Sequence, residues 1–204
     1  METTSYHLEL TLLTDLLGTV PKNTDIYAQY IASRTPENTK DELDTVPDEM
    51  AGWTGFHILD GQPILYDYVI KGFFKDAAGV LRRVTGSQSS KLKAYKKIID
   101  GLVFVTPRQI PLVLPTGASL GTIERPLRAQ TAQGERVALA RSDTAPAGTR
   151  LVFDLTILGQ DVTEDTLREW LDYGAKRGLG QWRNAGWGTF TYTLSQDGAR
   201  LRPA

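Results

Sequence analysis

Gly178-Leu179-Gly180-Gln181-Trp182-Arg183-Asn184-Ala185-Gly186-Trp187-Gly188 is the stretch that decides the fold of this 204-residue chain. Its two Gly-x-Gly pairs let the backbone turn sharply and let a ligand approach the backbone N–H groups. Arg183 offers a fork of donors that suits phosphate, and the two tryptophans offer faces for stacking. This chemistry favours an extended polyanion over a small apolar ligand.

A helix precedes this loop and a strand follows it. Thr163 is the expected N-cap of the helix, and apolar residues recur at helical spacing over 167–174. Gly178 is predicted to end the helix in the αL conformation. Residues 190–194 then alternate between apolar and polar, which predicts a strand. The loop therefore marks the passage from a helix into the last strand of a sheet.

The rest of the chain supplies further regular elements. Period-two and helical spacing predict strands over 6–12, 102–106, 109–114 and 151–158, and helices over 66–81 and 90–99. Val80 is placed in the apolar stripe of the first of these helices. Residues 15–60 lose periodicity and are interpreted as a long insertion with one short helix near Asp25–Ser33. Residues 124–149 are interpreted as an exposed hairpin that turns at 132–135.

This order of elements predicts the fold class. Two main helices separated by strands on one antiparallel sheet match the β-α-β-β-α-β ferredoxin-like pattern, which RNA-recognition folds also use. We therefore expect an α+β protein with a single domain over residues 1–204. The 15–60 insertion and the 124–149 hairpin are expected to lie within that domain.

Composition limits the classes of function. The chain has no cysteine and hence no disulfide, and it shows no apolar run long enough for a membrane span and no signal peptide. A cytoplasmic protein without a membrane partner is expected. No P-loop, zinc-ligand spacing or nucleophile elbow is present, so neither a cofactor nor a metal is expected.

The net charge of −1 conceals a strong segregation of charge along the chain. Residues 15–60 carry nine acids against three bases, a net charge of −6. Residues 71–108 carry nine bases against two acids, or +7, and residues 125–150 carry five arginines against two acids, or +3. Such a chain can present a basic face to a polyanion despite its neutral total.

Three features together resemble the RAMP superfamily (repeat-associated mysterious proteins) of CRISPR-associated proteins. One is the glycine-rich loop between a helix and the final strand. The second is Val69-Ile70-Lys71-Gly72-Phe73-Phe74-Lys75-Asp76-Ala77-Ala78-Gly79-Val80-Leu81-Arg82. It is similar to the P-G-S-S-L-K-G-A-L-R segment that opens the first helix in that superfamily, although Pro and Ser are missing. The third is the basic hairpin, in the place where backbone subunits of multisubunit CRISPR effectors carry their thumb.

The resemblance implies an RNA-binding subunit of a CRISPR ribonucleoprotein that serves antiviral defence. Copies of such backbone subunits stack along a single-stranded guide RNA and contact other effector subunits. The residues that it assigns to RNA are Lys71, Lys75 and Arg82 on the first helix; Arg125, Arg128, Arg136 and Arg141 on the thumb; and Gly178, Gly180, Trp182, Arg183, Gly186 and Gly188 in the loop. Phosphate and sugar contacts suit a protein that must bind guides of any sequence.

The sequence favours an RNA-binding subunit without enzymatic activity, but three alternatives stay open. Processing endoribonucleases of the same superfamily use a histidine near the first helix, and His57 is the nearest candidate. Some backbone subunits that cleave target RNA use an aspartate after the first strand; Asp25 lies in a comparable stretch, with Asp15 and Asp44 as competitors. The last alternative is a divergent interaction protein outside guide-RNA defence that binds a protein through its acidic insertion.

Overall fold

A computed structural model of the chain describes residues 2–22, 53–131 and 134–196, and their side chains except those of 127–131 and 134–139. The elements in chain order are β1 (Thr3–Leu12), β2 (Leu16–Leu17), β3 (Val20–Pro21), β4 (Trp53–Gly55), β5 (His57–Leu59), β6 (Gln62–Tyr66), α2 (Asp67–Leu81), η1 (Ser89–Lys91), α3 (Tyr95–Leu102), β7 (Val103–Thr106), β8 (Gln109–Pro111), β9 (Gly121–Thr131), β10 (Gly134–Ala145), β11 (Arg150–Leu158), α4 (Glu164–Arg177), η2 (Arg183–Ala185) and β12 (Phe190–Gln196).

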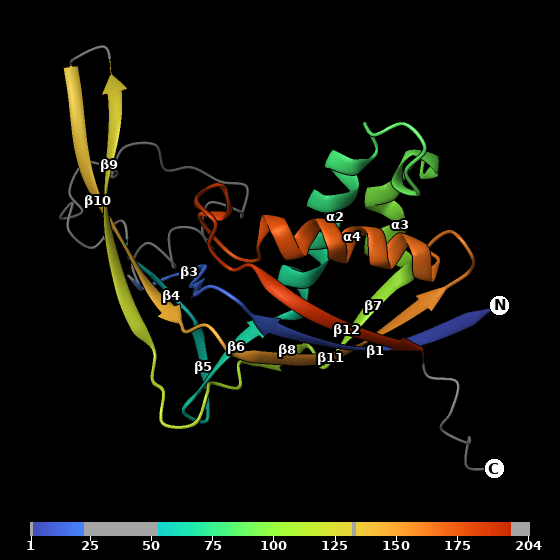
Figure 1. The fold of residues 1–204 in the computed structure, drawn as a ribbon, viewed down its shortest axis with the longest axis horizontal. Coiled ribbons are helices and arrows are strands. Elements are labelled where there is room, and N and C mark those ends of the chain that lie inside the picture. The colour runs from blue at the N-terminus through green and yellow to red at the C-terminus, as the bar shows by residue number, and fades with distance from the viewer. Residues whose placement is uncertain (1, 23–52, 132–133, 197–204) are drawn as a thin grey trace, which may run out of the picture.

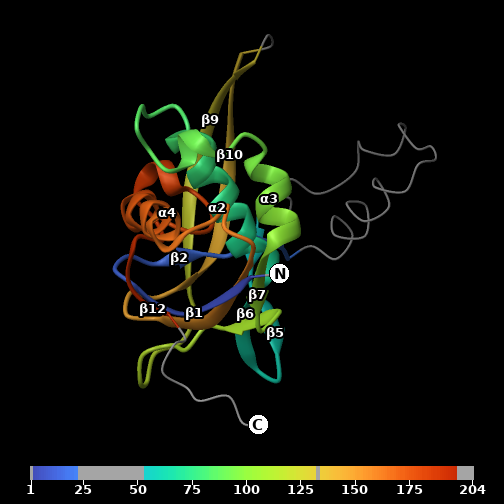
Figure 2. The same cartoon turned by 90° about the vertical axis from the view of Figure 1, so that its right-hand side faces the viewer.

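A four-stranded antiparallel sheet forms the centre of the molecule, in the order β12-β1-β11-β7. The alternation predicted for β1 is confirmed, because Tyr6, Leu8, Leu10 and Leu12 are at most 5% exposed. Since successive strand residues point to opposite faces, one face of the sheet is apolar and the other polar. The helices cover the apolar face, as Figures 1 and 2 show.

Helices α2 and α4 pack against each other over this sheet. Phe74 of α2 lies 5.4 Å from the ring of Trp170, which is fully buried as predicted. Gly174 permits the close approach, because a Cβ there would lie 2.1 Å from the Phe73 ring. The prediction for Val80 is wrong: its side chain is 42% exposed, because the end of α2 extends beyond the core.

The second basic helix, expected over residues 90–99, is instead split into η1 and α3. Leu92 lies between them in an extended conformation and is 7% exposed, so burying this leucine interrupts the helix. Glu169 of α4 holds the preceding turn by accepting the N–H groups of Gln88 and Ser89 at 2.6 and 3.0 Å. A tertiary contact therefore overrides the helical spacing.

The predicted hairpin forms, with β9 and β10 paired antiparallel from Gly121–Thr144 to Thr131–Gly134. Its outer part rises away from the other elements in Figure 1. Near its base, β10 also pairs antiparallel with β2 and parallel with β4. Strands β5, β6 and β8 make a further small antiparallel sheet.

The described residues thus form an α+β fold with three α-helices and both mixed and antiparallel sheets. A single sheet with two main helices was too simple an expectation, because the 15–60 insertion contributes short strands to the hairpin base. The helix expected at 25–33 lies outside the described residues. None of the helices in the described ranges is long and apolar enough to cross a membrane.

Candidate nucleic-acid interface

Gly178 and Gly188, the outer glycines of the loop, let its two ends lie in close contact. A Cβ at Gly178 would lie 2.1 Å from the Trp187 carbonyl oxygen, and one at Gly188 would lie 2.1 Å from that of Leu179. The Leu179 N–H donates to the Gly188 carbonyl at 2.9 Å. Gly178 has a positive φ of 89°, but its ψ of 165° is extended, so the predicted αL ending is wrong. This conformation of Gly178 turns the chain from the end of the helix directly into the loop.

The loop docks on the segment that follows β1. Gly180 lies against Leu16, so that a Cβ there would be 2.7 Å from the leucine Cδ1. Thr14 Oγ1 donates to the Gly186 carbonyl at 3.0 Å, and the Gly188 N–H donates to the Asp15 carbonyl at 2.9 Å. These bonds fix where the loop lies relative to the sheet.

Arg183 already has a protein partner. Its Nη1 donates to Asp76 Oδ2 of α2 at 2.8 Å, and its side chain is 26% exposed. Arg177 donates to Asn184 in the same loop. The arginine that the sequence assigned to phosphate therefore ties the loop to α2.

The hairpin meets the glycine-rich loop through Arg125 and Trp182. The Arg125 guanidinium lies 5.8 Å from the Trp182 ring centroid, within the range of a cation–π contact. Trp182 adopts the left-handed conformation with φ 50° immediately before η2. Arg125 is exposed, so one cation and one half-buried indole lie together at this junction.

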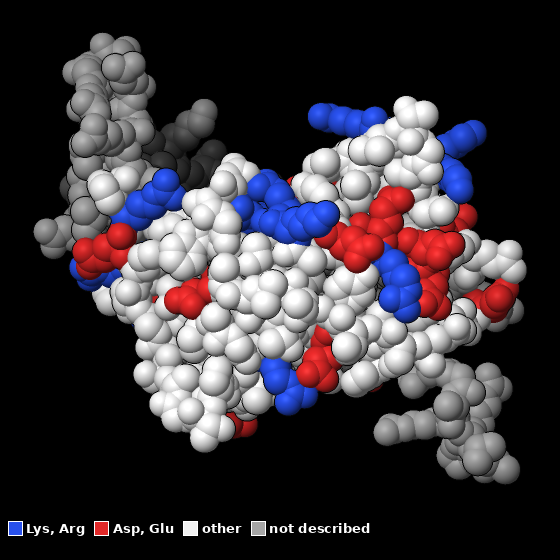
Figure 3. Space-filling view, in the orientation of Figure 1, with Lys and Arg blue, Asp and Glu red and all other residues white. Residues whose placement is uncertain are grey.

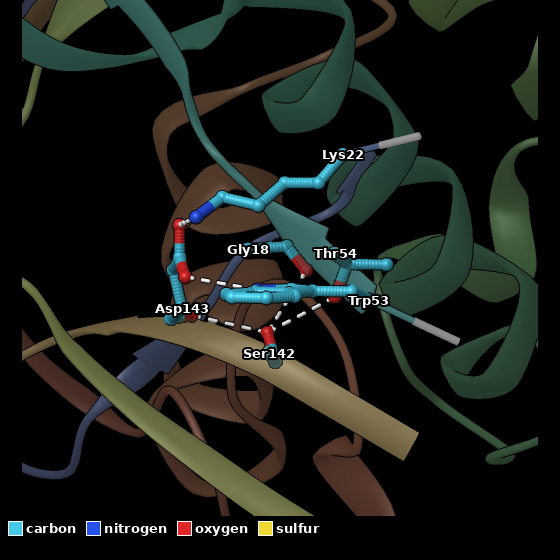
Figure 4. A network of polar contacts seen from close by, with 6 residues as sticks. All are labelled: Gly18, Lys22, Trp53, Thr54, Ser142 and Asp143. Atoms are coloured by element: carbon cyan, nitrogen blue, oxygen red, sulfur yellow. Dashed lines mark hydrogen bonds and ion pairs between the residues drawn. The ribbon is translucent and has the colours of Figure 1, made fainter. Parts of the chain in front are cut away.

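The base of the hairpin holds a polar network that the sequence analysis missed (Figure 4). Asp143 is 6% exposed and lies 2.6 Å from Lys22 Nζ. Its other oxygen accepts the Trp53 indole N–H at 3.1 Å. The Trp53 ring also lies 4.5 Å from Lys22 Nζ and 4.8 Å from the Arg141 guanidinium. Residues 142–144 are three consecutive polar residues, and all three are buried, which is unusual in a strand. This polar run is the one feature of the sequence that indicates the network.

Two further hydroxyls complete the network. Thr54 Oγ1 donates to Ser142 Oγ at 3.0 Å, and the Gly18 N–H donates to the Asp143 carbonyl at 2.9 Å. Arg141 also forms an ion pair with Glu124 across the hairpin. Three segments that are distant in sequence are thereby joined at the hairpin base.

The cations predicted on α2 point elsewhere. Lys75 Nζ pairs with Asp100 of α3 at 2.7 Å, and Lys71 Nζ lies 5.3 Å from the Phe104 ring. Arg82 lies over Tyr95 at 5.5 Å. These three residues face α3, whereas the glycine-rich loop contacts α2 through Asp76. For Arg128 and Arg136, only the backbone is described, and it pairs them with Val137 and Ala129.

Figure 3 shows Lys and Arg side chains gathered on the surface between the base of the hairpin and the helices. The polar face of the sheet differs. It carries a hydrogen bond between His7 and Asp154 and the ion pair Glu9–Arg150, both at 2.7 Å, among exposed or half-buried hydroxyl residues. Phe104 is the one aromatic side chain exposed on the described part of this face. The described part of the polar sheet face therefore lacks the row of stacking rings with which some RNA-binding domains bind bases on a sheet.

The described residues give little to a catalytic site. His57 packs edge-on against Tyr66 at 4.8 Å, and burial lowers the pKa of its imidazole. Asp15 Oδ1 accepts the Ala147 N–H at 2.9 Å. Asp25 and Asp44 lie outside the described residues. No group of three or more His, Asp or Glu in the described ranges could hold a metal ion.

In sequence, no protein-family model and no curated protein matches the chain. In structure, it is similar to a chain of the Type III-B Cmr-beta complex bound to cognate target RNA, solved by cryo-electron microscopy. The TM-score is 0.55 at 15% identity, over 96% of this chain and 61% of that one. A chain of a Type IV-B CRISPR complex gives a TM-score of 0.48 at 15% identity, over 98% of this chain and 93% of that one. The resemblance expected from the sequence is thereby confirmed as a similarity of fold to a chain of a CRISPR Type III-B Cmr complex.

Proposed function

We propose that this chain is an RNA-binding, backbone-type subunit of a CRISPR ribonucleoprotein, with guide RNA, further copies of itself and other effector subunits as partners. The fold would be a single ferredoxin-like domain. The sheet order β12-β1-β11-β7 with crossovers through α2 and α4 supports this assignment. The similarity to a subunit of an RNA-bound Cmr complex adds support at the level of fold.

The observation that carries the proposal is the meeting of Arg125 with Trp182. A cation on the hairpin and an aromatic ring on the loop lie together, with the guanidinium 5.8 Å from the ring centroid. A phosphate can bind the guanidinium while a base stacks on the indole, and neither contact reads sequence. The hairpin then acts as the thumb over a single strand of RNA.

The network at the hairpin base supports the same role. Asp143, Trp53 and Lys22 fix the base before any ligand arrives, so binding need not pay for ordering it. Arg183 would serve by holding the loop against Asp76, and its side chain is 26% exposed.

The test is the affinity of the purified chain for a short single-stranded RNA, measured by fluorescence anisotropy over a range of salt. We expect Arg125→Ala to weaken binding and to lower the salt slope by about 1, as for the loss of one phosphate contact. Trp182→Ala should cost about 1–3 kcal/mol of binding free energy, the worth of one stacked base.

The matched control is Arg150→Ala, which removes an arginine from the polar face of the sheet. It should leave both affinity and salt slope unchanged. Equal losses in Arg125→Ala and Arg150→Ala, or no salt-sensitive affinity in the unmodified chain, would contradict the proposal.

A further inference from the structure

The end of α2, the turn after it and α3 carry a cluster of unopposed positive charge. Between residues 82 and 99 the chain has six cations and no acid. All six are exposed, and none forms an ion pair within the described residues. We call this cluster the basic surface: Arg82, Arg83, Lys91, Lys93, Lys96 and Lys97.

The basic surface lies apart from the hairpin. In Figure 1 the end of α2, η1 and the start of α3 gather at the upper right, whereas β9 and the outer part of β10 stand at the left. Figure 3, in the same orientation, shows Lys and Arg side chains projecting from this upper right end. A ligand of the basic surface therefore contacts a different part of the molecule from a ligand of the Arg125–Trp182 junction.

Helix α4 borders the basic surface with acids. Glu169 accepts the N–H groups of Gln88 and Ser89 at 2.6 and 3.0 Å, so this helix adjoins the turn that carries the cations. The open hollow beside Gln88 is lined by three acids and two bases of α4: Asp165, Glu169, Asp172, Arg168 and Lys176. Unopposed positive charge ends at this border, and an anionic ligand therefore gains most on the side of α3.

The turn that carries Lys91 and Lys93 is fixed to the core. Trp170 Nε1 donates to Ser89 Oγ at 2.8 Å, and that hydroxyl donates to Glu169 Oε1 at 2.6 Å. Ser89 is fully buried. A backbone held in this way presents its lysines without the entropy cost of ordering the turn when a ligand binds.

The basic surface offers charge but no free aromatic face. Tyr95 is the one aromatic residue between 82 and 99, and it is half-buried with the Arg82 guanidinium 5.5 Å from its ring centroid. A single strand gains affinity by stacking its bases on rings, as proposed for Trp182. A double helix keeps its bases stacked inside and presents two lines of phosphate, with one charge per about 1.7 Å of its axis. A surface of cations alone therefore suits a duplex better than a single strand.

We propose that the basic surface binds the phosphate backbone of double-stranded RNA or DNA. Lysine and arginine contacts to phosphate carry no base sequence, so the ligand is recognised by its charge and its double-helical form. The inference goes beyond the proposed function and does not rest on it, because the single-stranded RNA of that function is assigned to Arg125 and Trp182.

The test is the double variant Lys96→Ala with Lys97→Ala of the full chain. Both lysines are exposed on α3, and alanine favours the helix. Fluorescence anisotropy with a short RNA duplex, and in a second arm with a DNA duplex of the same sequence, measures affinity over a range of salt. We expect the variant to lower the salt slope by about 2 and to weaken binding about sixtyfold at about 0.1 M salt, the loss of two phosphate contacts. Binding of either duplex supports the proposal, and the tighter one identifies the source.

Two controls separate this site from general charge and from the Arg125–Trp182 junction. Arg150→Glu lowers the net charge by two, as the double variant does, but changes the polar face of the sheet, and it should leave duplex affinity unchanged. Trp182→Ala should weaken binding of a single strand and spare the duplex, whereas the double lysine variant should do the reverse.

The proposal is overturned if the unmodified chain has no salt-sensitive affinity for either duplex, or if the double lysine variant and Arg150→Glu lose equal affinity. It is also overturned if the lysine variant weakens single-strand and duplex binding equally. If polyglutamate of matched charge displaces the labelled duplex as well as unlabelled duplex does, the surface fits an acidic polypeptide and the proposal is wrong. Failure of the proposed function gives a separate result: no affinity for a single strand while duplex affinity is intact.

Discussion

Replacing Asp143 tests whether the network at the hairpin base stabilises the fold. Asp143→Ala removes a carboxylate that is 6% exposed, the acceptor of the Trp53 indole and the partner of Lys22 at 2.6 Å. Truncating one member of a buried ion pair costs about 3–5 kcal/mol. The Lys22 side chain is 42% exposed and can regain water, so we expect the lower end, about 3 kcal/mol.

The matched control is Asp100→Ala. Asp100 pairs with Lys75 at 2.7 Å, nearly the same distance, but its side chain is 56% exposed. An exposed pair of this kind contributes about 0–1 kcal/mol. The two variants therefore remove an ion pair at nearly the same separation, and they differ in burial and in the Trp53 hydrogen bond that Asp143 accepts. Asp143→Asn, which keeps an acceptor for Trp53 but loses the charge, should fall between them.

Urea unfolding followed by tryptophan fluorescence measures all three variants. If Asp143→Ala lies within about 0.5 kcal/mol of the unmodified chain, the network is only a solvated surface contact, and the account of a fixed hairpin base is wrong. The same conclusion would follow if Asp100→Ala and Asp143→Ala lost equal stability.

Two further predictions concern the loop and the last strand. Gly188→Ala should lower the free energy of unfolding by at least about 3 kcal/mol, because its Cβ would meet the Leu179 carbonyl. Gly186→Ala faces open space and should cost only about 1 kcal/mol for its positive φ. Thermal unfolding compares the two variants, and equal losses of stability would contradict the close contact between the two ends of the loop. Burial and the hydrogen bond to Asp172 raise the pKa of Tyr192 from 10.0 to about 12. Since the folded state keeps the neutral phenol, this stabilisation is complete below pH 10 and is lost as the pH rises through 12. Absorbance titration with Tyr192→Phe as reference checks it, and ionisation near pH 10 in the folded chain would refute it.

The elements that could be predicted are those with one continuous buried face. The alternation in β1 and β11 and the spacing in α2 and α4 each report on a core contact made every second or every third to fourth residue. Thr163 was predictable as N-cap because its function is local: Oγ1 accepts the Thr166 N–H at 3.3 Å. Strands β2 to β5 have two or three residues, too few for any period, and so could not be found.

The candidate RNA-binding residues, which rest on the loop motif, the resemblance and the charge pattern, stay a prediction, and the structure adds long-range contacts of several of them. The sequence located the glycine-rich loop and the hairpin arginines, but Arg183 finds its partner Asp76 107 residues away. Trp53 and Asp143 are 90 residues apart, and neither has a local feature that predicts the other. Residue type suggests which chemistry a side chain can perform, whereas its neighbours in space decide whether that capacity is already used.

Arg125 and Arg183 illustrate how this changes the proposed interface. Both are arginines beside the loop, but Arg183 pairs with a half-buried carboxylate, whereas Arg125 lies on an aromatic ring and stays exposed. A phosphate that approached Arg183 would compete with Asp76, while one that approached Arg125 would meet a guanidinium that has no carboxylate partner within the described residues. Arg125 of the hairpin is therefore a stronger candidate for the first phosphate contact than Arg183, the arginine of the loop motif. The loop then contributes mainly by placing Trp182 beneath it.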